Sequence, residues 1–114
     1  MKNADAVKAL SALAQETRLA VFRLLVEKGP SGMTAGKIAE ALDIVPATLT
    51  FHLKELSAAG LLESHSEGRF VIYSTRFDRM NELVAFLTSN CCGGNPCTPV
   101  TVCLPPKRAD KAKV

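Results

Sequence analysis

The sequence predicts a small, mainly α-helical domain that carries one β-hairpin. Its 114 residues and 47% hydrophobic content suit one domain with a modest core. Apolar residues recur at three- and four-residue intervals through residues 4–60 and again through residues 78–90, which is typical of helices. Between these parts, two runs rich in β-forming residues flank a Glu67-Gly68 turn, which is typical of a hairpin.

Composition predicts the first of two consecutive helices, and a Gly-Pro pair marks the end of the second. Residues 4–13 are rich in Ala and Leu and predict a short helix. Residues 17–28 predict a second helix, which Gly29-Pro30 ends. Apolar positions cover most of its circumference, so we expect it to be the central core helix. The residues that repeat around its interior are Leu19, Phe22, Leu25 and Val26.

The next two helices lie close enough in the sequence to form one motif. Thr34 is a suitable N-cap for a helix with a single apolar stripe, which is made of Ile38, Ala39 and Leu42. Pro46 suits the first turn of another helix, which Gly60 ends near residue 59. Residues 43–45 form a three-residue break between them. The sequence therefore predicts a helix-turn-helix.

The last helix carries an apolar stripe that needs cover from outside a small core. Residues 78–90 return to the helical period, and the stripe consists of Met80, Leu83, Val84 and Leu87. The simplest way to cover such a stripe is a second copy of the chain, related by two-fold symmetry. The sequence therefore predicts a homodimer whose interface includes these four residues.

One face of the helix that begins at Pro46 is predicted to contact DNA. Leu49, Leu53 and Leu56 share the opposite face and are expected to pack on the core. The outward residues are Ala47, Thr48, Thr50, Phe51 and Lys54. Their hydroxyl groups can reach base edges or phosphates, their methyl groups and ring can contact thymine methyl groups, and the ammonium can neutralise a phosphate. The alternative for Phe51 is that its ring turns sideways into the core.

Two histidines and one arginine lie next to these predicted contacts. His52 falls close to the leucine stripe, which favours a partly buried, hydrogen-bonded side chain over a base reader or a metal ligand. Arg69 and His65 flank the hairpin turn, where a wing can follow the sugar-phosphate backbone or enter a minor groove. We predict a DNA contact for Arg69 and an exposed position for His65.

The order of elements and two motifs resemble a known family. The segments P-A-T-L-T-F-H-L-K-E-L-S-A-A-G-L-L (residues 46–62) and E-G-R-F-V-I-Y (residues 67–73) are similar to those of the ArsR/SmtB family of winged-helix, metal-responsive repressors. The resemblance covers residues 5–90, and its specific part is H-L-K-E-L-x-x-A-G-L-L. It implies a homodimer joined through its first and last helices. Such a dimer binds double-stranded operator DNA with two-fold symmetry and leaves it when an inducer binds.

The chain departs from that family where many members hold their metal. Many arsenic and cadmium sensors carry a cysteine motif on the first helix of the helix-turn-helix, but residues 31–45 contain no cysteine. Zinc sensors often use carboxylates and histidines on the last helix. Asp78 and Glu82 lie one turn apart there, but no histidine follows His65. The sensing site is therefore expected among the four cysteines, which all lie within residues 91–103.

An adjacent cysteine pair is the anchor of this segment. Cys91 and Cys92 can turn both sulfurs toward one soft ion once the backbone leaves helical geometry, and the two glycines that follow predict a helix end. Three thiolates bind trivalent arsenic as a neutral, three-coordinate complex, whereas four-thiolate zinc sites usually draw on C-x2-C knuckles, which are missing here. The predicted ligands are Cys91, Cys92 and Cys97, with Cys103 as a weaker alternative. The predicted inducer is trivalent arsenic as arsenite, with antimonite and methylarsenite as further candidates.

Three alternatives remain open for the cysteines. They can form a thiol-based redox switch, sense another thiophilic metal such as cadmium or lead, or bind a monosubstituted organoarsenical through only two thiols. An enzyme is not expected, because the C-x5-R loop of cysteine-dependent phosphatases and arsenate reductases is missing.

The predicted organisation has three parts. Residues 1–90 form the winged helix-turn-helix and dimerisation domain, residues 91–103 the cysteine-rich metalloid-binding segment, and residues 104–114 a basic, disordered tail. The net charge of +3 arises in the last eight residues, because the remaining 106 hold ten basic and ten acidic side chains. DNA binding therefore requires a locally basic face. No apolar run approaches the length of a membrane span and no signal-peptide pattern opens the chain, so a cytoplasmic protein without a membrane partner is expected.

Overall fold

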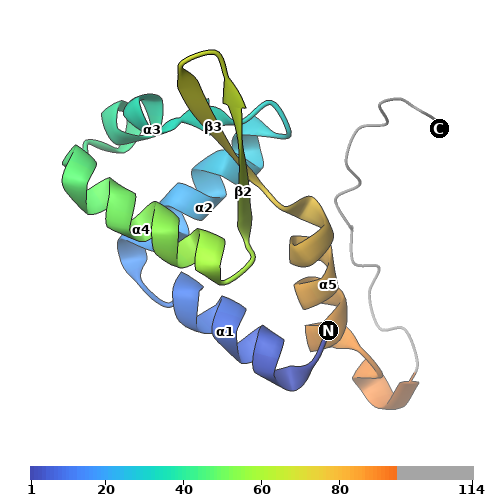
Figure 1. The fold of residues 1–114 in the computed structure, drawn as a ribbon. Coiled ribbons are helices and arrows are strands. Elements are labelled where there is room, and N and C mark those ends of the chain that lie inside the picture. The colour runs from blue at the N-terminus through green and yellow to red at the C-terminus, as the bar shows by residue number, and fades with distance from the viewer. Residues whose placement is uncertain (95–114) are drawn as a thin grey trace.

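The computed structural model, which describes residues 1–94, is a group of helices with a small antiparallel sheet whose β-hairpin projects from one side (Figure 1). The helices are α1 (Asn3–Leu13), α2 (Glu16–Lys28), α3 (Ala35–Leu42), α4 (Pro46–Ala58) and α5 (Phe77–Thr88). The strands are β1 (Met33–Thr34), β2 (Leu62–Glu67) and β3 (Phe70–Thr75), and a short 3-10 turn, η1, spans Cys91–Gly94. The predictions for Cys97, Cys103 and the basic tail lie outside the described residues.

The helix-turn-helix has the boundaries that its capping residues predict. The Thr34 hydroxyl oxygen accepts a hydrogen bond from the Lys37 backbone N–H at 3.3 Å, so it caps α3 as expected. Asp43 ends that helix in the left-handed conformation, with φ of 54°. Pro46 occupies the first turn of α4, and Gly60 follows the helix with φ of +81°. Mainly helical structure with one hairpin is therefore confirmed as the fold class.

The sheet contains one strand that the sequence did not predict. Its order is β1-β3-β2, and all neighbours are antiparallel. Met33 pairs with Tyr73 and Thr34 with Ile72, where a loop was expected. A two-residue strand has no periodicity of its own, so only the pairing with β3 reveals it. Gly32 permits this approach, because a Cβ atom there would lie 2.5 Å from the Tyr73 carbonyl oxygen, and its φ is +71°.

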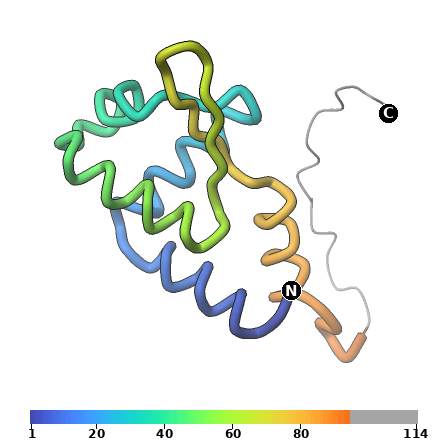
Figure 2. Tube along the Cα trace, in the orientation of Figure 1, coloured from blue at the N-terminus to red at the C-terminus, as the bar shows by residue number. Residues whose placement is uncertain are grey.

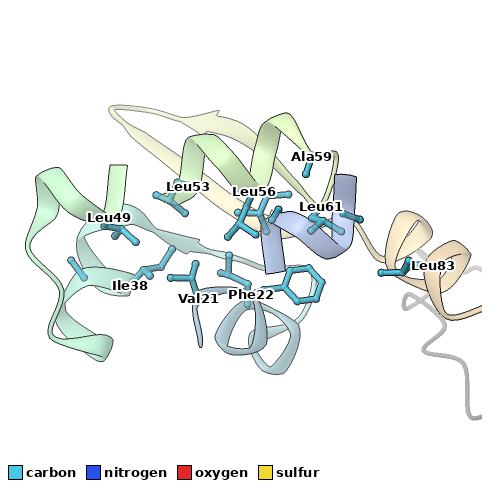
Figure 3. Packing of buried hydrophobic residues seen from close by; sticks show 14 of the residues in the cluster. Val21, Phe22, Ile38, Leu49, Leu53, Leu56, Ala59, Leu61 and Leu83 are labelled. Atoms are coloured by element: carbon cyan, nitrogen blue, oxygen red, sulfur yellow. The ribbon is translucent and has the colours of Figure 1, made fainter. Parts of the chain in front are cut away.

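The core lies between α2, α3 and α4, with the start of β2 at its edge (Figure 3). Leu49, Leu53 and Leu56 on α4 are 0–2% exposed, as their spacing predicts. They face Val21 and Ile38, both fully buried. One prediction for α2 is wrong: Leu19 is 43% exposed. The buried face of α2 consists of Val21, Phe22 and Leu25 and is narrower than the apolar content of the helix suggested.

The last helix packs beside the first (Figure 2). Leu83 is only 6% exposed in a single chain, since it joins the core cluster against which Met80 also packs. Apolar side chains that stay exposed on these two helices are Val7 (53%), Leu10 (41%) and Leu87 (57%). Among the described residues, no helix combines the length and apolar character needed to cross a lipid bilayer.

Candidate nucleic-acid interface and thiol pair

The outward face of α4 is exposed along its length. All five residues predicted to lie there, Ala47, Thr48, Thr50, Phe51 and Lys54, are exposed. Phe51 is 55% exposed, so the alternative in which its ring turns into the core is wrong. The buried leucines on the opposite face hold this surface in place. The helix can therefore present hydroxyl, methyl, aromatic and ammonium groups to a ligand as one rigid row.

The two threonines of this row differ in what they can offer. The Thr50 hydroxyl donates a hydrogen bond to the Pro46 carbonyl oxygen at 3.0 Å. While that bond is made, Thr50 presents its methyl group and oxygen lone pairs outward, so it can accept from a base edge or contact a thymine methyl group but cannot donate to a phosphate. Thr48 lies in the first turn of the helix and is exposed.

His52 is a structural residue, as expected. Its side chain is 7% exposed, and its Nδ1 atom lies 3.5 Å from Nη1 of Arg18 on α2. Burial, followed by the charge of Arg18, lowers the pKa of His52 below its usual value of 6.5. The ring is therefore neutral near pH 7, with Nδ1 as the acceptor for the guanidinium. The Phe51 ring meets the His52 ring edge-on, with the centroids 5.6 Å apart.

Arg69 lies at the exposed tip of the wing formed by β2 and β3. It is the one basic residue between residues 62 and 75, which also contain Glu63 and Glu67, so a phosphate contact by the wing would be limited to the tip. His65 is exposed, and its Nε2 atom pairs with Glu67 Oε2 at 3.0 Å.

Two exposed apolar residues next to that tip were not predicted from the sequence. Phe70 is 63% exposed and Val71 44% exposed. Their strand was assigned correctly, but the pairing of β3 with β2 does not by itself tell how far the hairpin extends beyond the core. Their exposure could have been predicted from their position directly after the Glu67-Gly68-Arg69 turn, because neither face of a hairpin is covered near its turn.

The two adjacent cysteines lie just beyond the end of α5. Cys91 is half-buried, Cys92 is exposed, and their Sγ atoms are 3.8 Å apart. Cys92 has φ of 56° and ψ of 40°, and Asn90 also has a positive φ of 57°. The backbone has therefore left regular helical geometry at the pair, as expected, and the two sulfurs lie close together. Since Cys97 and Cys103 lie outside the described residues, the third ligand remains a prediction.

The carboxylates of α5 are engaged in ion pairs. Asp78 Oδ2 accepts from Arg76 Nη2 at 2.9 Å, and Glu82 Oε1 accepts from Arg79 Nη1 at 3.2 Å. Burial raises the pKa of Asp78, but the hydrogen bond and charge of Arg76 outweigh it and hold the pKa below its usual value. Within residues 1–94, no three His, Cys, Asp or Glu side chains come together in a geometry that could hold a metal ion.

The four residues predicted at the dimer interface are placed differently from one another. Met80 and Val84 are half-buried and Leu87 is exposed, so these three reach the surface. The expectation that Leu83 needs a partner to cover it is wrong, because its own chain already buries it. A stripe at helical spacing does not tell how much of it the same chain will cover.

Comparisons with known proteins agree with this arrangement. Residues 13–65 match the model of a helix-turn-helix domain. The chain is 36% identical over 67 residues to YceK of Bacillus subtilis, an uncharacterised helix-turn-helix transcriptional regulator, covering 59% of this chain and 66% of YceK. It is 31% identical over 83 residues to MJ1325 of Methanocaldococcus jannaschii, described in the same way, covering 73% of this chain and 91% of MJ1325.

Solved structures cover a larger share of this chain than the domain model does. An ArsR-like transcriptional regulator from Rhodococcus sp. RHA1 superimposes with a TM-score of 0.66 and 28% identity, over 74% of this chain and 76% of that protein. A possible transcriptional regulator for arsenical resistance gives a TM-score of 0.62 and 26% identity, over 72% and 82% of the two chains. The chain therefore belongs to the helix-turn-helix transcriptional regulators and has the winged-helix architecture of the ArsR type.

Proposed function

We propose that this regulator is a homodimeric repressor that binds a two-fold operator through α4 and the wing and leaves it when trivalent arsenic binds Cys91, Cys92 and Cys97. The observation that carries the proposal is the 3.8 Å separation of the Cys91 and Cys92 sulfurs at the end of α5. Cys103 is the weaker alternative to Cys97. The solved relative described as a possible regulator of arsenical resistance supports the same inducer.

The α4 surface and the wing tip support DNA as the ligand. Lys54 and Arg69 can neutralise phosphates, while Thr48, Thr50 and the Phe51 ring can contact base edges and thymine methyl groups. Since the body of the chain has no excess of positive charge, these local cations must supply most of the attraction to phosphate. Two copies related by a two-fold axis would present two such faces to half-sites about 34 Å apart.

Exposed apolar side chains on α1 and α5 support the dimer. Val7, Leu10 and Leu87 are each more than two-fifths exposed, and the two helices that carry them pack together in one chain. Large apolar side chains on neighbouring helices favour burial against a partner, and a second copy is the simplest partner with a matching surface. The proposed interface would then include Leu87, which precedes Cys91 by four residues.

Binding of arsenous acid by the thiols is a ligand exchange that needs no added oxidant or reductant. Arsenous acid has three hydroxyl groups on one arsenic atom. Each As–O bond that breaks is replaced by an As–S bond, the thiol proton leaves with the hydroxyl group as water, and three such exchanges give a neutral complex and three waters. The two sulfurs that already lie close together lower the entropic cost of the first two exchanges.

The start of α5 links this site to α4. The Arg76 backbone N–H donates to the Leu61 carbonyl oxygen at 2.9 Å, directly after α4 ends. Arg79 Nε lies 3.4 Å from the position that a Cβ atom on Gly60 would take, so its guanidinium covers the end of α4. Ordering the far end of α5 around arsenic would thus act on a helix whose start contacts the residues that directly follow α4 and whose exposed side is proposed to face the partner. A coupling of about 3 kcal/mol would weaken DNA binding about 150-fold.

The test replaces both adjacent cysteines by serine in the full chain. A duplex selected by the wild-type protein from a random-sequence pool serves as the probe in a gel-shift assay. We expect arsenite to release the wild type and the matched Ser89→Ala variant, and to leave the Cys91→Ser, Cys92→Ser double variant bound. Arsenate, which is pentavalent, should release none of them. The proposal is wrong if arsenite still releases the double variant.

The same assay separates the alternatives. Release by peroxide but not by arsenite would indicate the redox repressor. Release by cadmium or lead at lower concentrations than arsenite would indicate a sensor of those metals. Selection of no sequence by the wild type would contradict the DNA-binding part of the proposal.

A further inference from the structure

We propose that Arg18 is a positioning residue for the DNA-contacting face, joining the end of α1 to the His52 ring on which the Phe51 side chain rests. The inference rests on the proposed function, since it assigns how that face is held. It does not involve the cysteines. It comes from three contacts that follow one another, from Ala12 to the partly buried Arg18 guanidinium, from Arg18 to His52, and from His52 to Phe51.

The first contact ties Arg18 to the end of α1. Arg18 Nε donates to the Ala12 carbonyl oxygen at 2.7 Å, and Ala12 lies in the last turn of that helix. The Arg18 backbone N–H also donates to Gln15 Oε1 at 2.8 Å, which caps α2. The residue is therefore held from both its backbone and its side chain at the α1–α2 joint. Charge-assisted hydrogen bonds to a helix-end carbonyl are among the stronger ones in proteins.

The second and third contacts lead from the joint to the α4 surface. Arg18 Nη1 lies 3.5 Å from Nδ1 of His52, which is 7% exposed. The next residue, Phe51, is 55% exposed and meets the same ring edge-on. A neutral imidazole can accept from the guanidinium, whereas a protonated one has no acceptor and repels it. The orientation of an exposed aromatic side chain thus depends on the protonation of a buried neighbour.

The elements packed against α4 carry further charged groups. A depression of about 440 Å³ beside Arg18 is lined by Lys8 from α1 and Glu55 from α4. The other helices and strands packed on α4 contribute Lys37 and Glu40 on α3, and Glu63, His65 and Glu67 on β2, and these side chains are exposed. Solvent screens the exposed charges, so Arg18 is the charged group that acts most directly on His52.

The α1–α2 joint connects the Arg18–His52 contact to the helix that carries part of the proposed dimer interface. Val7 and Leu10, proposed at the dimer interface, lie on the same helix whose end Arg18 holds. A shift of α1 relative to α2 would pull on the Ala12 carbonyl and, through the guanidinium, on His52. The geometry therefore makes Arg18 a link between the partner-facing helix and the row of side chains that reads DNA.

The experiment measures DNA affinity of the full-length protein by fluorescence anisotropy between pH 5.5 and 8.0. The probes are the duplex selected by the wild type and an unrelated duplex of equal length. His52→Asn keeps an acceptor near the position of Nδ1 but does not titrate, and Arg18→Lys keeps the charge but cannot make both contacts. His65→Asn is the matched control, because the chain has only two histidines.

We expect wild-type affinity for the selected duplex to fall about fivefold or more as the pH drops to 5.5, and His52→Asn to remove that dependence while His65→Asn keeps it. Arg18→Lys should weaken binding to the selected duplex about tenfold at pH 7.5 and binding to the unrelated duplex less than about twofold. A merely structural Arg18 would lower both affinities together through loss of folded protein. An unchanged pH profile in His52→Asn, or equal losses on both duplexes in Arg18→Lys, overturns the inference. Failure of the wild type to select any duplex would instead contradict the proposed function.

Discussion

The α4 face and the thiol pair are both at the surface, but they are held in different ways. Behind the α4 face, Leu49, Leu53 and Leu56 are buried to 0–2% exposure, so the row of outward side chains is positioned by core packing. The thiol pair lies in a turn with no buried residue, and its geometry comes from positive φ angles at Asn90 and Cys92. A surface backed by a core keeps one conformation, whereas a turn held by its own backbone can be reorganised by a ligand.

The largest expected effect comes from removing the support of the α4 face. Leu56→Ala should lower the free energy of unfolding by about 2–5 kcal/mol, because it removes a fully buried side chain and leaves a cavity. Urea unfolding followed by circular dichroism measures this loss.

Ser57→Ala, at the next and exposed position of the same helix, is the control and should change the free energy of unfolding by less than about 0.5 kcal/mol. Equal losses of unfolding free energy in the two variants would contradict the role of the buried leucines as the support of the α4 face.

The next largest effect is expected from the third thiol. Cys97→Ser should weaken arsenite binding about a hundredfold, which corresponds to about 2.7 kcal/mol, because only two As–S bonds can then form. Phenylarsine oxide, which has one position blocked by carbon, needs only Cys91 and Cys92 and should bind the variant as well as it binds the wild type. Isothermal titration with both reagents, compared with Cys103→Ser, identifies the third ligand. A loss of arsenite binding in Cys103→Ser alone would reverse the assignment.

A smaller effect should follow from removing one phosphate contact. Lys54→Ala is expected to weaken binding to selected and unrelated duplexes alike, about tenfold, and to reduce the slope of log affinity against log salt by about one. Arg69→Ala should act in the same direction at the wing tip. Fluorescence anisotropy at several salt concentrations tests both. An unchanged slope in either variant would remove that residue from the DNA interface.

The smallest effect concerns the pH dependence of folding. Burial lowers the pKa of His52, so the unfolded chain takes up its proton near pH 6.5 while the folded protein takes it up only at lower pH. Stability should therefore be lost as the pH falls through 6.5 and should level off below the folded pKa. His52→Asn should show a shallower fall between pH 7.5 and 5.5 in thermal unfolding. A steeper fall in that variant would contradict a depressed pKa.

The same contrast explains how much the sequence could predict. The helix-turn-helix was predictable because local signals mark it, namely the Thr34 cap, Pro46 and Gly60, and because the leucine spacing assigns one face of α4 to the core. The outward row then follows from the helical period. The adjacent cysteines could be placed at a helix end from the glycines that follow them.

Features that depend on contacts between distant residues were not predictable in this way. Strand β1 is too short to carry a period, and Leu19 is exposed because the surface that α2 covers is narrower than its apolar face. The contact between Arg18 and His52 joins residues 34 positions apart, and neither residue has a local signal for the other. Periodicity predicts which side of a helix faces inward but not which polar groups meet there.

The short pairing of β1 with β3 has a mechanical consequence for operator choice. Thr34 caps α3 and also lies in β1, which pairs with β3 of the wing, so one residue connects the wing to the helix-turn-helix. In the proposed complex, this connection would limit changes in the offset between the groove that α4 would enter and the groove that the wing tip would enter. In the proposed two-fold dimer, an inducer that moves the two subunits relative to each other would alter the spacing at which two half-sites can be occupied together.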